Sequence, residues 1–166
     1  MGQLVGKVAL ITGASKGVGR VMSRVFAGEG AAVICAARSR DLVEETTALV
    51  KADGGRAIAV VGDAAVEADV LRIVQAGVKA FGKLDTLVNN AGDGGPTKPV
   101  QDYTAEDWFY TINSCLTSSY MFIWNWVMFE ANADRATGRS TFGASAALAR
   151  DGSEPIMMTL RMCSGV

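Results

Sequence analysis

The chain has 166 residues, of which 49% are hydrophobic and 20% charged, and its formal net charge is -1. This length and composition predict one globular domain with a sizeable core, and the near-neutral charge gives no sign of a nucleic-acid or anionic-membrane partner. The chain contains no histidine, which excludes any triad, metal site or proton relay that needs an imidazole.

Three cysteines, at positions 35, 115 and 163, lie far apart and form no C-x-x-C pair. This spacing argues against a disulfide scaffold or a structural zinc site, so we expect no metal. Reduced cysteines suit the cytoplasm, and residues 1–7 contain no apolar signal-peptide core. We therefore expect a cytoplasmic protein.

The first expected element is a buried strand at residues 8–11 (VALI), followed directly by the glycine-rich segment 12–19 (TGASKGVG). A helix is expected to open in this segment, because apolar residues then recur with the 3.6-residue period and form one face. The residues of this face are Val18, Val21, Met22, Val25 and Phe26.

The three glycines of this segment allow a tight turn and a close approach of the backbone to a ligand. The free N–H groups and the positive dipole end of the helix then favour a phosphate. The spacing G-x-x-x-G-x-G differs from the commonest dinucleotide fingerprint, and an ordinary strand-to-helix turn is the alternative. We expect a nucleotide cofactor at this turn.

The chain continues as alternating strands and helices up to about residue 122. Strands are expected at 32–36, 57–61 and 84–88, and helices at 41–52 and about 68–81. The strands are short and apolar without alternation, as in a parallel sheet covered by helices on both faces. Repeated β-α-β units predict an α/β fold with a doubly wound parallel sheet. After the loop at 93–99, Thr104 is expected to cap a further helix, with Asp107 as its capping partner.

Four motifs in this order resemble the short-chain dehydrogenase/reductase family. They are TGASKGVG at 12–19, Asp63 after the third strand, NNAG at 89–92, and Asn113 in the helix that begins near Thr104. The resemblance covers roughly residues 4–121. It implies a Rossmann-type sheet that binds a nicotinamide dinucleotide, with about four parallel strands and flanking helices in this chain. We expect residues 1–122 to form this dinucleotide-binding portion and residues 123–166 to be an atypical tail without a domain of its own.

The resemblance also implies the residues of the site. Asp63 would accept a hydrogen bond from the adenine amino group, although a loop or N-cap role is the alternative. Asn113 is the remaining catalytic position of the family, either a buried asparagine that bends its helix or orders a water, or a solvent-facing polar residue. The expected cofactor-binding residues are Gly13, Ser15, Lys16, Gly17, Val18, Gly19, Arg38, Ser39, Asp63, Ala64, Asn90, Ala91 and Gly92.

The end of the second strand indicates which dinucleotide binds. NAD enzymes usually carry an acidic residue there for the ribose 2′-OH. Residues 36–40 (AARSR) contain no acid, and the guanidinium of Arg38 could form paired hydrogen bonds to a 2′-phosphate. Lys16 adds a second cation, so NADP is expected rather than NAD, although solvated loop charge is the alternative for the arginines.

The family's proton-transfer pair, Y-x-x-x-K, is missing from this sequence. The residues four positions after Tyr103, Tyr110 and Tyr120 are Asp107, Ser114 and Trp124, and the last lysine is Lys98. We therefore expect a catalytically incomplete member of an alcohol/carbonyl oxidoreductase family. The alternatives are a non-catalytic nucleotide- or partner-binding remnant, and a poorly folding product whose sheet ends near strand four with an unpaired edge.

The tail from residue 122 departs from the family, through either a reading-frame shift after about residue 120 or a genuine variant C-terminus. Its first part is an apolar cluster at 120–129 that is too short to span a membrane. This cluster is expected to be a core or interface helix, or an exposed patch that drives self-association. The substrate cannot be read from the sequence.

Overall fold

The computed structural model describes residues 2–137 and 156–159, with side chains described for residues 2–128. Five parallel strands form one sheet in the order β3-β2-β1-β4-β5. Their bounds are β1 Val8–Thr12, β2 Ala32–Ala37, β3 Arg56–Val61, β4 Thr86–Asn89 and β5 Ile156–Thr159. Every residue of β1 and β2 is buried, which explains why both strands read as continuous apolar runs. The predicted doubly wound parallel sheet is confirmed.

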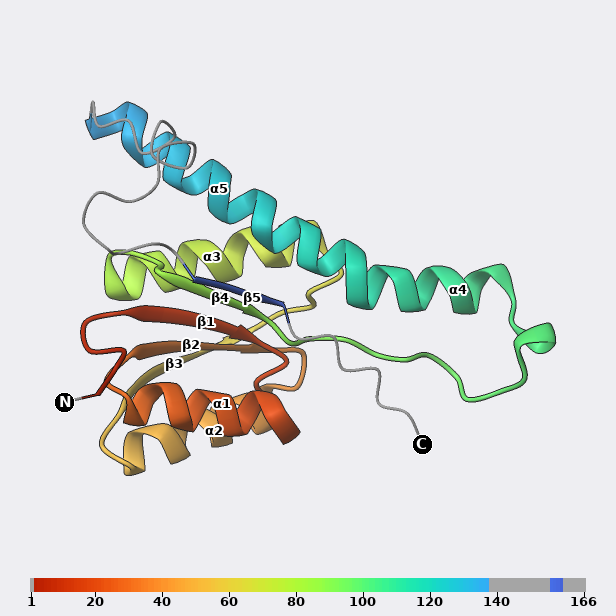
Figure 1. Ribbon diagram of the computed structural model, residues 1–166, viewed down its shortest axis with the longest axis horizontal. Coiled ribbons are helices and arrows are strands. Elements are labelled where there is room, and N and C mark those ends of the chain that lie inside the picture. Colours follow the sequence, from red (N-terminus) through yellow and green to blue (C-terminus); the bar gives the residue numbers. More distant parts are fainter. Residues whose placement is uncertain (1, 138–155, 160–166) are drawn as a thin grey trace.

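Helices cover both faces of the sheet (Figure 1). The first two, α1 Gly17–Gly28 and α2 Arg40–Ala52, lie on one face, and α3 Glu67–Phe81 lies on the other with α5 Ser118–Thr137. Each face has its own apolar cluster, one centred on Ile11 and Val33 and the other on Leu10 and Ile34. Cluster residues that are neighbours along β1 and β2 belong to opposite clusters, because side chains along a strand point alternately to the two faces of the sheet.

Helix α1 does not pack through the apolar face that the sequence predicts. Its buried residues are the small ones, Gly19, Ser23 and Ala27, spaced four apart. Val21 and Val25 are 59% and 55% exposed. Small side chains let the helix axis lie close to the sheet. Burial of this small-residue face is therefore favoured over burial of the larger apolar residues beside it. Met22 and Phe26 are partly buried at the edge of the same contact.

The helix expected at Thr104 begins there and then changes its geometry. Thr104 and Asp107 form the predicted capping box, with the Asp107 N–H donating to Thr104 Oγ1 at 3.2 Å and the Thr104 N–H to Asp107 Oδ2 at 2.8 Å. Helix α4 spans Ala105–Ile112, and a π-helical turn, η2 Asn113–Thr117, joins it to α5. A short 3-10 helix, η1 Val100–Asp102, precedes the cap.

Two further boundaries differ from the sequence expectations. The fourth strand is Thr86–Asn89 rather than 84–88, so Leu84 is buried but precedes the strand. Helix α5 continues without a break across Phe122, where the dinucleotide-binding portion was expected to end. The expected stretch without periodicity, 131–152, lies outside the described residues beyond Thr137.

The unpaired edge beside the fourth strand, which the alternative of a poorly folding product implied, is not found. Strand β5 pairs with β4 in parallel, with Thr86 opposite Ile156 and Asn89 opposite Thr159. Pairing satisfies main-chain groups of β4 that would otherwise be open to another chain. The four-residue run of β5 is too short and too isolated in the sequence to be recognised as a strand. Within the described residues, no helix is long and apolar enough to cross a membrane.

Candidate functional site

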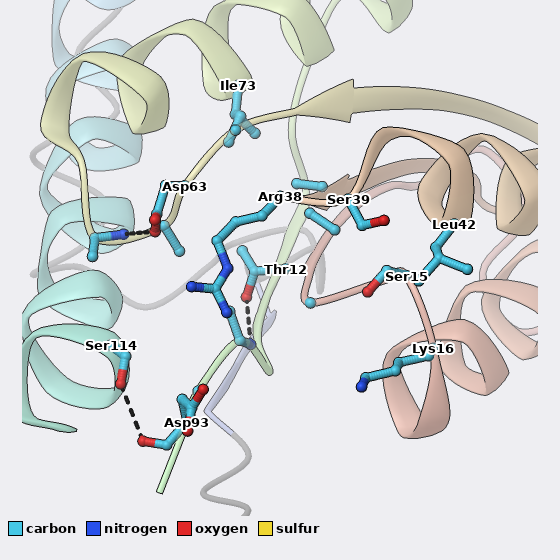
Figure 2. Close-up of a pocket in the computed structure, with 18 of the residues that line it drawn as sticks. Thr12, Ser15, Lys16, Arg38, Ser39, Leu42, Asp63, Ile73, Asp93 and Ser114 are labelled. Carbon is cyan, nitrogen blue, oxygen red and sulfur yellow. Dashed lines mark hydrogen bonds between the residues drawn. The ribbon is translucent and has the colours of Figure 1, made fainter. Parts of the chain in front are cut away.

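A cavity of about 270 Å³ lies at the carboxyl ends of β1, β2 and β4 (Figure 2). This is the edge of a parallel α/β sheet where ligands ordinarily bind. The cavity is lined by all the expected cofactor-binding residues except Gly17, Val18, Gly19 and Asn90. The fold therefore brings residues from three separate motifs to one place.

The turn between β1 and α1 needs its glycines. Gly13 and Gly17 have φ angles of +66° and +55°, a region that side chains disfavour. Gly19 is required for a different reason, because a Cβ at this position would overlap the carbonyl oxygen of Gly13 and lie 2.7 Å from Nδ2 of Asn90. Helix α1 begins with no side-chain cap and no acidic residue in its first turn. Its first N–H groups can therefore bind an anion.

Asn90 does not line the cavity but stabilises the turn through hydrogen bonds to its backbone. Its Nδ2 donates to the carbonyl oxygens of Thr12 at 2.9 Å and Gly13 at 3.3 Å. The Thr12 hydroxyl accepts the N–H groups of Asn90 and Ala91 at 3.0 and 2.9 Å. These bonds join the end of β1 to the segment after β4, so the glycine turn and the NNAG motif form one rigid unit.

Arg20 stabilises the other side of the turn, although no sequence motif indicated this role. Its guanidinium donates to the carbonyl oxygen of Ser15 at 2.8 Å and pairs with Glu45 of α2 at 2.7 Å. Thr46 of α2 accepts a further hydrogen bond from Arg20 Nε at 3.0 Å. Helix α2 thus fixes the position of Ser15, which lines the cavity.

Two cations face the cavity, Lys16 from the turn and Arg38 from the end of β2. Asp63 lines the same cavity after β3. Its Oδ1 accepts the N–H of Ala65 at 2.9 Å, and its own N–H donates to Asp69 at 2.8 Å. Asp63 therefore has the loop-ordering contacts that were its alternative role, while its carboxyl group still lies in the cavity wall.

Asn113 opens the π-helical turn and is exposed, which agrees with the alternative of a solvent-facing polar residue and not with a buried asparagine. Its Oδ1 accepts a hydrogen bond from the hydroxyl of Thr117 at 3.1 Å. The irregular turn places the next residue, Ser114, in the cavity wall instead. There the Ser114 hydroxyl donates to the carbonyl oxygen of Asp93 at 3.1 Å (Figure 2).

Tyr110 and Asp93 form a polar group that no sequence motif indicated. The Tyr110 hydroxyl donates to Asp93 Oδ2 at 2.8 Å. This bond, the N–H of Gly95 and the charges of Arg38 and Lys16 lower the pKa of Asp93 below its usual range. The Tyr110 hydroxyl beside the guanidinium, with the charges of Asp63 and Asp93, raises the pKa of Arg38. No sequence pattern joins these residues, since they come from three different loops and helices.

The sequence model of the short chain dehydrogenase family matches residues 7–139. The chain belongs to this family. General stress protein 39 of Bacillus subtilis is 38% identical over 120 residues, which are 71% of this chain and 42% of that protein.

Solved structures of the family also resemble this chain. A short chain dehydrogenase from Burkholderia cenocepacia in complex with NADP has a TM-score of 0.71 and 33% identity, covering 76% of this chain and 51% of the other. An NAD+-bound xylitol dehydrogenase has a TM-score of 0.72 and 33% identity, covering 75% and 48% of the two chains. The chain thus spans about half the length, or less, of the relatives that it matches.

Several features of the cavity suit a nicotinamide dinucleotide. The uncapped N-terminus of α1 provides N–H donors for the pyrophosphate. The space beside Gly17 is open, because no atom lies within 4 Å of the position that a Cβ would take. The cations Lys16 and Arg38 line the same wall as Ala91 and Gly92. When bound, the dinucleotide would supply hydride transfer, which is chemistry of the cofactor rather than of the protein.

Proposed function

We propose that this chain binds NADP in the cavity at the carboxyl edge of the sheet, as the cofactor-binding portion of an oxidoreductase for an alcohol/carbonyl pair. One observation carries the proposal. Arg38 and Lys16 line the same cavity as the glycine turn, and no acid ends β2. In that arrangement Gly13, Ser15 and the start of α1 bind the pyrophosphate, and Asp63 and Ala64 lie against the adenosine.

A preference for NADP over NAD follows from the charges. A 2′-phosphate is a dianion with acceptor oxygens that match the planar guanidinium of Arg38, and a 2′-hydroxyl is neutral. A charged hydrogen bond contributes roughly 1.5–3 kcal/mol. We therefore expect NADPH to bind more than about tenfold more tightly than NADH.

Titration of the purified chain with NADPH and NADH, followed by nicotinamide fluorescence, tests this preference. Arg38→Ala should narrow the difference between the two affinities. Arg24→Ala is the matched control, because Arg24 also lies on the α1–α2 side but pairs with Asp53 away from the cavity. Equal affinities for the two dinucleotides, or a tighter complex with NADH, would contradict the proposal.

The second candidate, a nucleotide-binding protein without turnover, is favoured by the missing Y-x-x-x-K. Lys98 lies 5.6 Å from the centre of the Tyr103 ring, but neither residue lines the cavity. The hydroxyl of Tyr103 donates to the carbonyl oxygen of Pro96 instead of facing the cofactor site. The chain therefore offers the substrate no lysine-activated phenol that could exchange a proton.

The 166-residue chain should then show no measurable oxidoreductase activity on a broad panel of alcohols and carbonyl compounds. Loss of general acid–base assistance alone lowers rates by about 10²–10⁴-fold. The assay monitors NADPH absorbance at saturating cofactor, with a complete family member as the positive control. Turnover that persists after rigorous repurification, and that is lost on Arg38→Ala, would show that the chain is a working enzyme.

We further propose that residues 1–122 form the dinucleotide-binding portion and that residues 123–166 are not a domain of their own. The continuity of α5 across Phe122 and the packing of this residue in the core support a single unit. We also propose that the chain works in the cytoplasm and associates with itself through exposed aromatic residues of α4 and α5. Asn113 is proposed as the one catalytic position of the family that is retained here.

A further inference from the structure

Arg20 lies on α1 outside the cavity, yet its guanidinium reaches the backbone of the glycine turn. Its Nη2 and Nε donate to the carbonyl oxygen of Ser15 at 2.8 and 3.2 Å. Ser15 lines the cavity, whereas Arg20 does not. Arg20 therefore binds this carbonyl oxygen from outside the cavity.

Helix α2 fixes the guanidinium in this position. Glu45 accepts two hydrogen bonds from Arg20, from Nη1 to Oε1 at 3.1 Å and from Nη2 to Oε2 at 2.7 Å. The buried hydroxyl of Thr46 accepts a third from Nε at 3.0 Å. Because a paired arginine–carboxylate contact restrains direction as well as distance, the guanidinium has one defined orientation.

The contact with Arg20 also orients the peptide group between Ser15 and Lys16. No cis peptide bond occurs in the described part of the chain, and the carbonyl and N–H of a trans peptide point in opposite directions. The N–H of Lys16 is therefore directed away from Arg20. Among the described residues, no backbone carbonyl accepts this N–H. Ser15 and Lys16 both line the cavity (Figure 2), so the free donor is available to a ligand there.

The orientation of this peptide matters for an anion, because an N–H group attracts a phosphate and a carbonyl oxygen repels it. The turn contains Gly13 and Gly17, both with positive φ angles. Glycine has a wide conformational range, so the peptides beside it can rotate at little cost. A contact that holds the Ser15 carbonyl on the outer side therefore keeps the turn in the form that binds an anion.

We propose that Arg20 is a positioning residue for the pyrophosphate of the dinucleotide. It binds the Ser15 carbonyl oxygen and thereby keeps the Lys16 N–H facing the ligand, while Glu45 directs the guanidinium. This inference rests on the proposed binding of a dinucleotide in the cavity. It implies a loss of affinity that NADPH and NADH share, since both contain the pyrophosphate.

Arg20→Met tests the role, because it removes the guanidinium and keeps a side chain that favours the helix. We expect NADPH and NADH each to bind at least about tenfold more weakly, the worth of one hydrogen bond to a charged group. Adenosine 2′-phosphate contains no pyrophosphate and should bind the wild-type chain and the variant equally in competition titrations. An equal loss for adenosine 2′-phosphate would show a merely structural role, and unchanged NADPH affinity would also overturn the inference.

Arg24→Met is the matched control for this variant. Arg24 lies one turn further along α1 and pairs at 2.7 Å with Asp53, at the end of α2. Both variants lose one charge and one ion pair between the two helices, so urea unfolding should show similar losses of stability. Only Arg20→Met should lose NADPH affinity. A loss of the same size in Arg24→Met overturns the inference.

Glu45→Ala separates the orientation of Arg20 from its charge. The Glu45 side chain is 52% exposed, so the fold should tolerate the change. By charge alone, removal of this carboxylate would tighten the binding of an anionic dinucleotide. Loss of the contact that directs Arg20 should instead weaken NADPH binding about two- to tenfold. Tighter or unchanged binding overturns the inference, and this variant decides the matter if Arg20→Met does not fold.

The failure of this inference can be told apart from the failure of the proposed function. If the wild-type chain binds NADPH no more tightly than NADH, but Arg20→Met weakens both, the cofactor preference is wrong and the role of Arg20 stands. If NADPH is preferred and Arg20→Met leaves both affinities unchanged, the role of Arg20 is wrong and the preference stands. A wild-type chain that does not bind adenosine 2′-phosphate contradicts the 2′-phosphate contact, and Glu45→Ala then decides the role of Arg20. A folded chain that binds neither dinucleotide overturns both.

Discussion

At the scale of single residues, Gly19 is the tightest point of the cofactor turn. A Cβ there would overlap the Gly13 carbonyl oxygen, which is main chain and cannot rotate away. We therefore expect Gly19→Ala to displace the turn, to cost about 1–3 kcal/mol of unfolding free energy as overpacking does, and to abolish NADPH binding. Urea unfolding and fluorescence titration measure the two effects.

Gly28 is the matched control for Gly19, since it ends the same helix and a Cβ there meets no atom within 4 Å. Gly28→Ala should leave NADPH binding unchanged and stabilise the chain by up to about 1 kcal/mol, because alanine favours the helix. If the two alanine variants show the same unfolding free energy and the same NADPH affinity, steric crowding does not explain why position 19 needs glycine.

The cap of α4 depends on one ionised carboxylate. Lys98 and the backbone and hydroxyl of Thr104 lower the pKa of Asp107 to about 2, and Lys98 Nζ lies 2.6 Å from Asp107 Oδ2. Because the pKa is lower in the folded state, this contribution to stability is complete above about pH 4, near the unfolded pKa. It is lost as the pH falls toward 2.

We expect Lys98→Gln to move the pKa of Asp107 up from about 2 toward its usual value. An NMR titration of the Asp107 carboxyl carbon measures the shift. Lys83→Gln is the control, because Lys83 pairs with Asp85 near the start of β4 and not with the α4 cap. If Lys98→Gln leaves the titration unchanged, the ion pair does not contribute to the cap in solution.

At the scale of elements, α1 shows that close packing decides which face of a helix is buried. Ala27 is 8% exposed and packs in the core cluster beneath the helix, whereas Val21 is 59% exposed. Ala27→Leu should therefore cost about 1–3 kcal/mol through overpacking. Val21→Leu should change stability by less than about 0.5 kcal/mol, as surface substitutions do.

Urea unfolding of the two leucine variants measures this difference. Leucine is a better helix former than valine and a slightly poorer one than alanine, so propensity alone would favour Val21→Leu slightly and would cost Ala27→Leu only a few tenths of a kcal/mol. A larger loss of stability at Val21 than at Ala27 would mean that the apolar face read from the sequence is the buried one in solution.

At the scale of the whole molecule, α4 and α5 expose a row of large apolar side chains next to a buried one. Phe122 and Trp126 pack into the core, while Tyr120 and Trp124 are 59% and 49% exposed and their rings stack at 6.4 Å. Further exposed members of this row are Trp108, Phe109, Leu116 and Met128. An apolar surface of this kind marks an interaction site.

We expect the chain to form oligomers through this row, and Trp124→Glu to shift the population toward monomer. Sedimentation velocity measures both. Val21→Glu is the control, because Val21 is equally apolar and exposed but lies on α1, on the opposite face of the sheet. A wild-type chain that sediments as a single monomeric species at micromolar concentration would contradict the expectation.

The sequence by itself determined most elements and most of the expected residues that line the cavity. The strands at Val8, Ala32 and Arg56 and the helices α1 to α3 lie within one or two residues of the expected ranges. Most of the expected cofactor residues line one cavity because each motif follows a strand, and the ends of parallel strands meet at one edge of the sheet. These features depend on local patterns, such as short apolar runs, glycine turns and the helical period.

Only the tertiary structure decided which surfaces these elements share. The burial of Ser23 rather than Val21, the pairing of β5 with β4, and the support of the glycine turn by Arg20 and Asn90 all join segments through space. The same holds for the hydrogen bond between Tyr110 and Asp93. A single sequence records each residue's type and its neighbours along the chain, whereas these contacts depend on how closely the packed elements approach one another.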